Sequence, residues 1–171
     1  AMRGLLRSQY QLAKWPEATE NAKELLQFKG ASADDKLLSN MVLARAARQE
    51  NQYDLAISYY KSVAGGSKGE MSAEARYEIA WCQFEQDKIK EAEKSAFEVI
   101  NKSGSYERWV TRAYILLGDI YMKQQDFFNA KATFQSVVEN ASIPELKEEA
   151  QRKLNEATNA EKKQNSVSAQ N

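Results

Sequence analysis

The sequence predicts an all-α fold in which antiparallel helical hairpins stack side by side as an array. Glycine and proline are scarce, seven and two in 171 residues, and the abundant Ala, Glu, Lys, Gln and Leu favour helices. Apolar residues recur at the i, i+3, i+4, i+7 spacing of one helical face. Pairs of such faces, joined by short polar turns, return at a nearly constant interval along the chain, as in helical repeat proteins.

The clearest hairpin spans residues 111–139. The presence of Gly118 within its first helix costs about 1 kcal/mol relative to alanine, which indicates that a second backbone crosses close by. Polar residues at 124–126 predict the turn. The apolar faces of the two helices are Tyr114, Leu117, Gly118 and Tyr121, and then Phe127, Ala130, Phe134, Val137 and Val138.

The N-terminal residues predict another hairpin, with its inner helix at 2–12. Trp15-Pro16 opens the returning helix, because proline is tolerated in a first helical turn. We expect Gly30 to end that helix in the left-handed conformation that glycine often adopts there.

The second hairpin begins where Ser32 and Asp35 resemble a capping box. Its turn is expected at Asn51-Gln52. The segment 65–69, GGSKG, is then predicted to be the most flexible loop of the chain.

A third hairpin is predicted over 70–103, and Ser103-Gly104 ends it. After the fourth hairpin, Ser142 and Glu145 again suggest a capping box. The weakly amphipathic segment 142–158 is polar on its outer face, as the end of a repeat array requires for solubility. The polar, low-complexity residues 159–171 are expected to be disordered.

The repeat register is shown by the small residues that open the returning helices, Ala18, Ala56, Ala92 and Ala130. The first and third intervals between them are equal, and the middle interval is slightly shorter. The units therefore alternate, and units two apart share one common offset. In the fourth unit, six residues match signature positions of a known repeat: Tyr114, Leu117, Gly118, Tyr121, Ala130 and Phe134.

On these residues the chain resembles the tetratricopeptide repeat, a helix–turn–helix of about 34 residues. The resemblance implies a right-handed superhelical array of hairpins with a C-terminal capping helix. The expected parts are units at 1–30, 31–66, 70–103 and 105–140, a capping helix at 142–158 and the tail at 159–171.

Composition argues against several classes of function. Lys+Arg and Asp+Glu are 24 each, so the chain lacks the basic surface of a general nucleic-acid binder. No apolar run approaches the ~20 residues of a membrane span. Histidine is absent, which removes the usual general base and metal ligand. The single cysteine, Cys82, has no histidine to activate it, and the 65–69 loop lacks phosphate-loop spacing. We therefore expect no enzymatic activity and no cofactor.

The resemblance further implies that the inner helices line a concave groove. Helical phase places ten residues towards it, which mix both charges with flexible methionines and suit a partner peptide or helix. They are Met41, Arg45, Arg48, Glu78, Cys82, Glu85, Arg112, Ile115, Asp119 and Met122. Two alternatives stay open: a solvated face whose charges pair with one another, and a last helix that folds back into the groove. The residues at the matching positions fit the family's carboxylate clamp poorly, so a chaperone-tail co-receptor is rejected as the leading interpretation.

These observations favour a protein–protein interaction or assembly scaffold. The alternatives are a structural spacer within a larger protein, or a recognition appendage to an enzyme domain outside this segment. The alternating spacing and the Gln/Asn-rich surface also resemble bacterial cell-envelope members of the family, such as the Tol-Pal-associated and outer-membrane assembly proteins. This resemblance suggests a fragment of such a protein and a periplasmic location. Self-association is expected through an open apolar edge at Leu5, Leu6 and Leu25.

Overall fold

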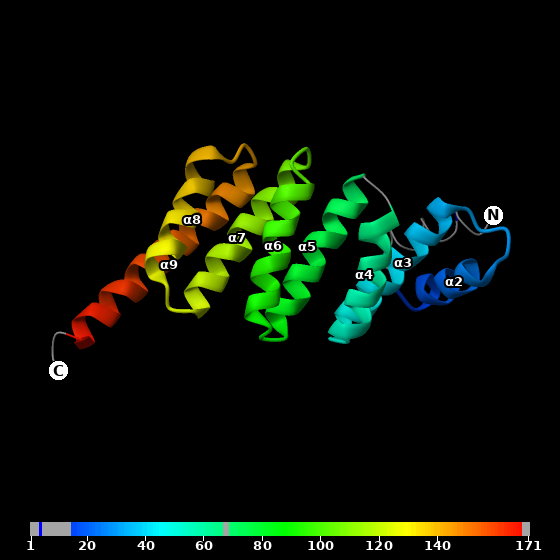
Figure 1. The fold of residues 1–171 in the computed structure, drawn as a ribbon, viewed down its shortest axis with the longest axis horizontal. Helices are drawn as coiled ribbons and strands as arrows, with labels where there is room; N and C mark the ends of the chain where they lie inside the picture. The colour runs from blue at the N-terminus through cyan, green and yellow to red at the C-terminus, as the bar shows by residue number, and fades with distance from the viewer. Residues whose placement is uncertain (1–3, 5–14, 67–68, 169–171) are drawn as a thin grey trace. The chain divides into compact units, whose positions relative to one another are not determined.

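The computed structural model describes Gly4 and residues 15–66 and 69–168. Within these ranges the chain forms eight helices and no strand (Figure 1), so the all-α prediction is confirmed. The inner helix expected at 2–12 lies outside the described residues. Packing divides the chain into two compact units, Ala1–Lys88 and Ile89–Asn171, and the boundary falls in the turn of the third hairpin.

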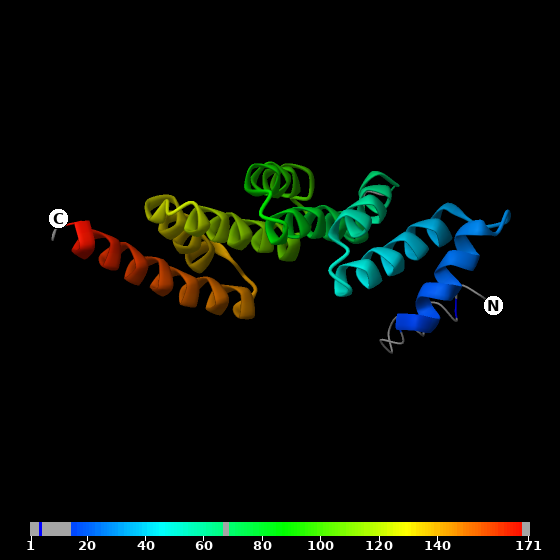
Figure 2. The ribbon, with the colours of Figure 1, turned by 90° about the horizontal axis from the view of Figure 1, so that it is seen from below.

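The first compact unit contains four helices: α2 (Trp15–Gln27), α3 (Ala33–Gln49), α4 (Tyr53–Gly66) and α5 (Glu70–Glu85). Each packs against the next, and α5 also touches α3 (Figure 2). One buried cluster joins α2 to α3 through Ala18, Leu25 and Val42. A second joins α3, α4 and α5, and Tyr60 and Val63 are fully buried within it. Leu25 is therefore a core residue, and its predicted place on an open apolar edge is wrong; Leu5 and Leu6 lie outside the described residues.

The second compact unit repeats this arrangement. Its helices are α6 (Ile89–Lys102), α7 (Glu107–Lys123), α8 (Phe127–Asn140) and α9 (Pro144–Ser168). α9 packs on α8 and touches α7, as α5 packs on α4 and touches α3. Leu146 and Ala150 of α9 share one buried cluster with Phe134 of α8 and Ile115 of α7. α9 thus follows α8 as an inner helix, in the place that α5 has after α4.

The turns inside the hairpins recur at the same repeat position. Asn51, Asp87 and Gln125 all adopt positive φ, at 57°, 61° and 60°. The intervals between them equal those between the alanines that open the returning helices, so the predicted register holds in the turns. In each turn the amide of the next residue donates to a carbonyl five residues back, as from Gln52 to Ala47 at 2.9 Å. This is the Schellman ending of a helix.

Glycine does not take this role in the described part of the chain. No glycine there has positive φ, so the left-handed conformation expected for Gly30 is wrong. The left-handed residues are instead Asn and Asp, which tolerate that region better than most residues, and an exposed Gln.

Gly118 lies against a side chain rather than a second backbone. A Cβ added to Gly118 would come within 2.3 Å of the Phe134 ring, and Phe134 is itself fully buried. The glycine in α7 therefore makes room for the aromatic ring of α8. The expectation that a second backbone crosses close to Gly118 is therefore wrong, because the nearest atoms belong to the Phe134 ring.

The two predicted capping boxes differ in outcome. Ser32 and Asp35 form one at the start of α3, with reciprocal side chain to backbone bonds of 3.1 and 3.0 Å. Ser142 does not, because α9 begins at Pro144. Instead the amide and hydroxyl of Ser142 donate to Glu107 of α7 at 2.8 and 2.5 Å. The start of α9 is thus tied to the start of α7.

Two segments expected to be irregular are helical. Gly65 and Gly66 belong to the last turn of α4, where the Ala64 carbonyl accepts bonds from Ser72 and Arg76 of α5. α9 continues to Ser168, so the disorder expected from residue 159 is wrong up to that residue. The Ala, Glu, Lys and Gln residues beyond 158 have high helix propensity, and Lys131 of α8 pairs with Glu161 at 2.5 Å.

Candidate functional site

The predicted groove residues of the first compact unit lie where α3 faces α5. Met41 and Cys82 are apolar members of the buried cluster and expose 2% and 0% of their surface. Glu78 exposes 6%, whereas Glu85, at the end of α5, is exposed. Of these four residues, only Glu85 presents its side chain freely to solvent.

The two arginines pair with glutamates across this contact. Arg45 forms an ion pair with Glu74, and the Arg48 Nε lies 3.2 Å from Glu78 Oε2. The Arg48 guanidinium also lies 4.1 Å from the centroid of the Trp81 ring, a favourable cation–π contact. Burial lowers the pKa of Arg45 from its ordinary value, and the guanidinium stays charged because that value is far above neutral.

A buried phenol and a buried thiol lie beside these pairs. Burial, followed by the charge of Glu78, raises the pKa of Cys82 to about 12. The same two causes raise the pKa of Tyr60. The Tyr60 hydroxyl forms no hydrogen bond with any residue that the structure describes. At neutral pH the Cys82 thiol is protonated and shielded, which is the opposite of an activated nucleophile.

In the second compact unit the predicted groove residues lie where α7 faces α9. Ile115 is buried in the cluster that includes Leu146 of α9, and Met122 is half-buried against the same cluster. Lys153 of α9 donates to Asp119 at 2.7 Å. Burial raises the pKa of Asp119 even though Lys153 opposes that shift. Arg112 is half-buried, with its guanidinium 5.7 Å from the Trp109 ring centroid.

The ten predicted residues therefore fall into two groups, one beside the contact of α3 with α5 and the other beside the contact of α7 with α9. The prediction assigned to a groove every face of an inner helix that does not pack within its own hairpin. In the structure, part of that face packs against the following inner helix. Three of the predicted charges form ion pairs across these contacts: Arg45 with Glu74, Arg48 with Glu78, and Asp119 with Lys153.

A depression of about 560 Å³ remains open between α3 and α5. Its apolar surface comes from Leu38, Met41 and Met71, and its charged rim from Arg45, Glu70 and Glu74. Glu70, Met71 and Glu74 were not among the predicted residues. Helical spacing could have found Glu74, because it lies one turn before the predicted Glu78 on the same face of α5. We call this set of six residues the α3–α5 depression.

Among the described residues, no group of three or more His, Cys, Asp or Glu side chains is placed to bind a metal ion. A helix able to cross a membrane is likewise missing from the described part of the chain.

Comparison with known proteins identifies the family. Residues 7–159 match the model of the tetratricopeptide repeat-like domain. The chain belongs to this family. Tetratricopeptide repeats commonly mediate protein–protein interaction, through the extended surfaces that stacked helical repeats create. A search of curated proteins finds no match.

Solved structures of other proteins share the fold. BtubC (BKLC) from P. vanneervenii matches with a TM-score of 0.73 at 16% identity, over 93% of this chain and 71% of that one. A Podosopora anserina putative kinesin light chain with nearly identical TPR-like repeats matches with a TM-score of 0.67 at 16% identity, over 98% of this chain and 89% of that one. At these identities the likeness shows the repeat fold alone.

Proposed function

We propose that this tetratricopeptide-repeat chain is a non-enzymatic scaffold that binds a peptide or helix of a partner protein at the α3–α5 depression. The observation that carries the proposal is the depression itself, in which half-buried Met71 and the edges of Leu38 and Met41 are bordered by charges. Flexible methionines adapt to an apolar side chain of a partner. An apolar centre with a polar rim is also the usual anatomy of a protein interface.

Charge around the depression selects the partner. Arg45 is paired with Glu74, whereas Glu70 is exposed and forms no ion pair with any residue that the structure describes. Among the described residues, the rim therefore carries one uncompensated negative charge. A partner segment that places a basic residue beside its apolar anchor complements this surface, and such complementarity favours specificity and association rate.

The test compares two charge reversals in the same compact unit. Glu70→Lys changes the rim of the depression, and Glu24→Lys makes the same change on the exposed face of α2. Both side chains are exposed, so neither substitution is expected to disturb folding. Reversal of Arg45 or Arg48 is a poorer test, because it leaves Glu74 or Glu78 facing a like charge in a half-buried contact.

In a pull-down from the native extract, the parent and Glu24→Lys are expected to recover the same partner, and Glu70→Lys to lose it. Titration of the purified partner is expected to show at least about tenfold weaker binding to Glu70→Lys, because a rim charge has been reversed. Equal binding by both variants would place recognition elsewhere on the chain.

One observation favours a second candidate function, a structural spacer. The charges of Arg45, Arg48 and Asp119 are already satisfied by neighbouring helices, so they stiffen the array whether or not a partner is present. A spacer recovers no partner with the parent chain. It also tolerates Glu70→Lys without loss of function in the full-length protein.

A further inference from the structure

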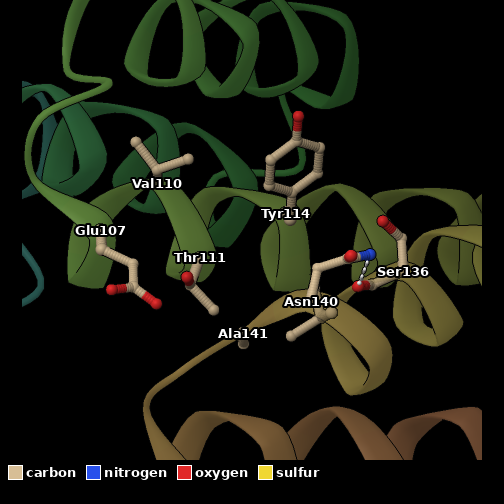
Figure 3. A pocket seen from close by; sticks show the side chains of 8 residues that line it. Glu107, Val110, Thr111, Tyr114, Ser136, Asn140 and Ala141 are labelled. Carbon is tan, nitrogen blue, oxygen red and sulfur yellow. Dashed lines mark hydrogen bonds between the residues drawn. The ribbon is translucent and has the colours of Figure 1, made fainter.

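A second concave site lies within the fourth hairpin, between the start of α7 and the end of α8. It encloses about 240 Å³, less than the roughly 300–1,000 Å³ of pockets that take small-molecule ligands. Figure 3 shows Glu107 and Thr111 on α7 and Asn140 on α8 around it. The volume suits the end of one side chain.

The second hairpin, which shares the alternating register of the fourth, fills the corresponding place. There Leu37 replaces Thr111 and Gly66 replaces Asn140. The Leu37 side chain packs so closely over Gly66 that a Cβ added to the glycine would come within 2.6 Å of it. In the fourth hairpin the shorter threonine leaves the space open, so the second hairpin has no equivalent of this pocket.

The polar groups that line the pocket are mainly hydrogen-bond acceptors. The Asn140 amide nitrogen donates to the Ser136 carbonyl at 2.9 Å, which leaves the amide oxygen of Asn140 to accept. Glu107 receives both bonds from Ser142 on Oε1, which leaves Oε2. These bonds lower the pKa of Glu107, so the carboxylate is charged at neutral pH.

The charge of the pocket is uncompensated by the residues that the structure describes. None of its described lining residues is a lysine or arginine, and Glu107 forms no ion pair with any basic residue in the described ranges. The last turn of α8 brings the partial negative charge of a helix C-terminus to the Asn140 side of the pocket, and the first turn of α7 brings the opposite partial charge to the Glu107 side. Val110, Tyr114 and Val137 supply apolar surface beside these acceptors.

We propose that this α7–α8 pocket receives a lysine or arginine side chain of a partner protein. The aliphatic stem of such a side chain can lie against Val110 and Tyr114 while its cationic end reaches Glu107 and Asn140. Hydrogen bonds to an ionised carboxylate are the stronger ones, so Glu107 supplies most of the selectivity. This inference rests on the proposed function, because the lysine or arginine side chain is taken to belong to a bound partner protein.

The probes for the first test are N-acetyl-arginine amide and N-acetyl-lysine amide, with N-acetyl-norleucine amide as the uncharged control. Each is titrated into the whole chain carrying ¹³C-labelled threonine and valine methyl groups. The two cationic probes are expected to shift the Thr111 and Val110 methyl signals in a saturable way, and the norleucine probe is not. Equal shifts from norleucine amide would overturn the assignment of a cation site.

Three variants locate the effect. Thr111→Leu fills the pocket as Leu37 fills its counterpart, and the Val110 shifts are expected to vanish. Glu107→Gln keeps an acceptor for Ser142 but removes the charge, and binding is expected to weaken about tenfold or more. Glu139→Gln makes the same charge change on the exposed face of α8 and is expected to bind as the parent does. Shifts that survive in Thr111→Leu would overturn the site.

Thermal melting of each variant shows whether it folds. If Thr111→Leu does not fold, Thr111→Val replaces the hydroxyl with a methyl of similar size, and weaker binding of the cationic probes is still expected. These titrations contain no partner, so their failure is distinct from a failure at the α3–α5 depression. With a purified partner, Glu107→Gln is expected to weaken binding where Glu139→Gln does not, and equal binding would overturn the partner assignment.

Discussion

A single missing Cβ determines how α7 packs on α8. A glycine inside a helix normally lowers stability by about 1 kcal/mol relative to alanine, so Gly118→Ala would ordinarily stabilise the protein. Here the new methyl group would lie 2.3 Å from the Phe134 ring, which is fully buried and closely surrounded. We expect Gly118→Ala to lower the free energy of unfolding by about 1–3 kcal/mol, the usual cost of overpacking.

Urea denaturation of Gly118→Ala measures this cost, and a double variant identifies its cause. In a Phe134→Leu background the ring is absent, so adding Gly118→Ala should cost much less than it does alone. The corresponding pair in the second hairpin is Ala44 with Tyr60, where alanine is already accommodated. Ala44→Gly should therefore destabilise the protein by about 1 kcal/mol. An unchanged or higher denaturation midpoint for Gly118→Ala would contradict this account.

At Gln125, which follows the end of α7 in the left-handed conformation, a glycine substitution is expected to stabilise the protein. Gln125 is exposed and has a φ of 60°, a conformation that glycine adopts without a Cβ penalty. We expect Gln125→Gly to raise the free energy of unfolding by about 0.5–1 kcal/mol. Gln124→Gly is the matched control, because Gln124 has a φ of −77° and glycine there should destabilise. Thermal melting of the two variants should shift in opposite directions.

At the scale of the helix, the contact between α7 and α9 contains a half-buried charge, that of Asp119. Because burial raises the pKa of Asp119 above its ordinary value, the unfolded chain loses that proton at lower pH than the folded protein does. The contribution of Asp119 is therefore present below the ordinary pKa and is lost as pH rises through the raised one. Asp119→Asn removes this titration. The unfolding free energy of the variant minus that of the parent should increase with pH across this window.

Urea denaturation of both proteins between about pH 3 and pH 7 covers the ordinary range of an aspartate. The sign of the trend is decisive. If attraction to Lys153 outweighed burial, the pKa would be lowered and the difference would fall as pH rises. A difference that is flat with pH would show that Asp119 titrates alike in the two states.

Helical periodicity predicts the second, third and fourth hairpins and the register between their turns, as the described residues show. It predicts one packing face for each hairpin well, as Tyr60 and Phe134 show by their complete burial. It does not reveal the second contact, made by α3 with α5 and by α7 with α9, since that contact mixes apolar and charged residues. Met41, Cys82 and Ile115 were therefore expected in an open groove although they are buried.

Local sequence rules also missed features that depend on distant residues. Serine is a common helix-capping residue, but the amide and hydroxyl of Ser142 both donate to the Glu107 carboxylate on another helix. Glycine is the residue type most often found in the left-handed conformation after a helix, yet Gly30 does not adopt it, whereas Asn51, Asp87 and Gln125 do.

For the molecule as a whole, a repeat array should respond to damage locally, because each hairpin packs only on its neighbours. A chain ending at Ala160 loses mainly the exposed end of α9 and the Lys131–Glu161 pair, so its stability should change by less than about 1 kcal/mol. A chain ending at Ala141 loses Leu146, Ala150 and Ala157, all buried in the second compact unit. Exposing the surface that Leu146 covers should alone cost about 1.5–3 kcal/mol.

Cys82 reports independently on the first compact unit, because it is the only cysteine in the chain. Its thiol is fully buried and its pKa is raised to about 12, so an aromatic disulfide reagent should react only when α5 opens locally. Removal of α9 should leave that rate within about twofold of the parent, as for distant and independent sites. A large acceleration would mean that the two compact units unfold together, and that the chain behaves as one cooperative domain rather than as an array of local contacts.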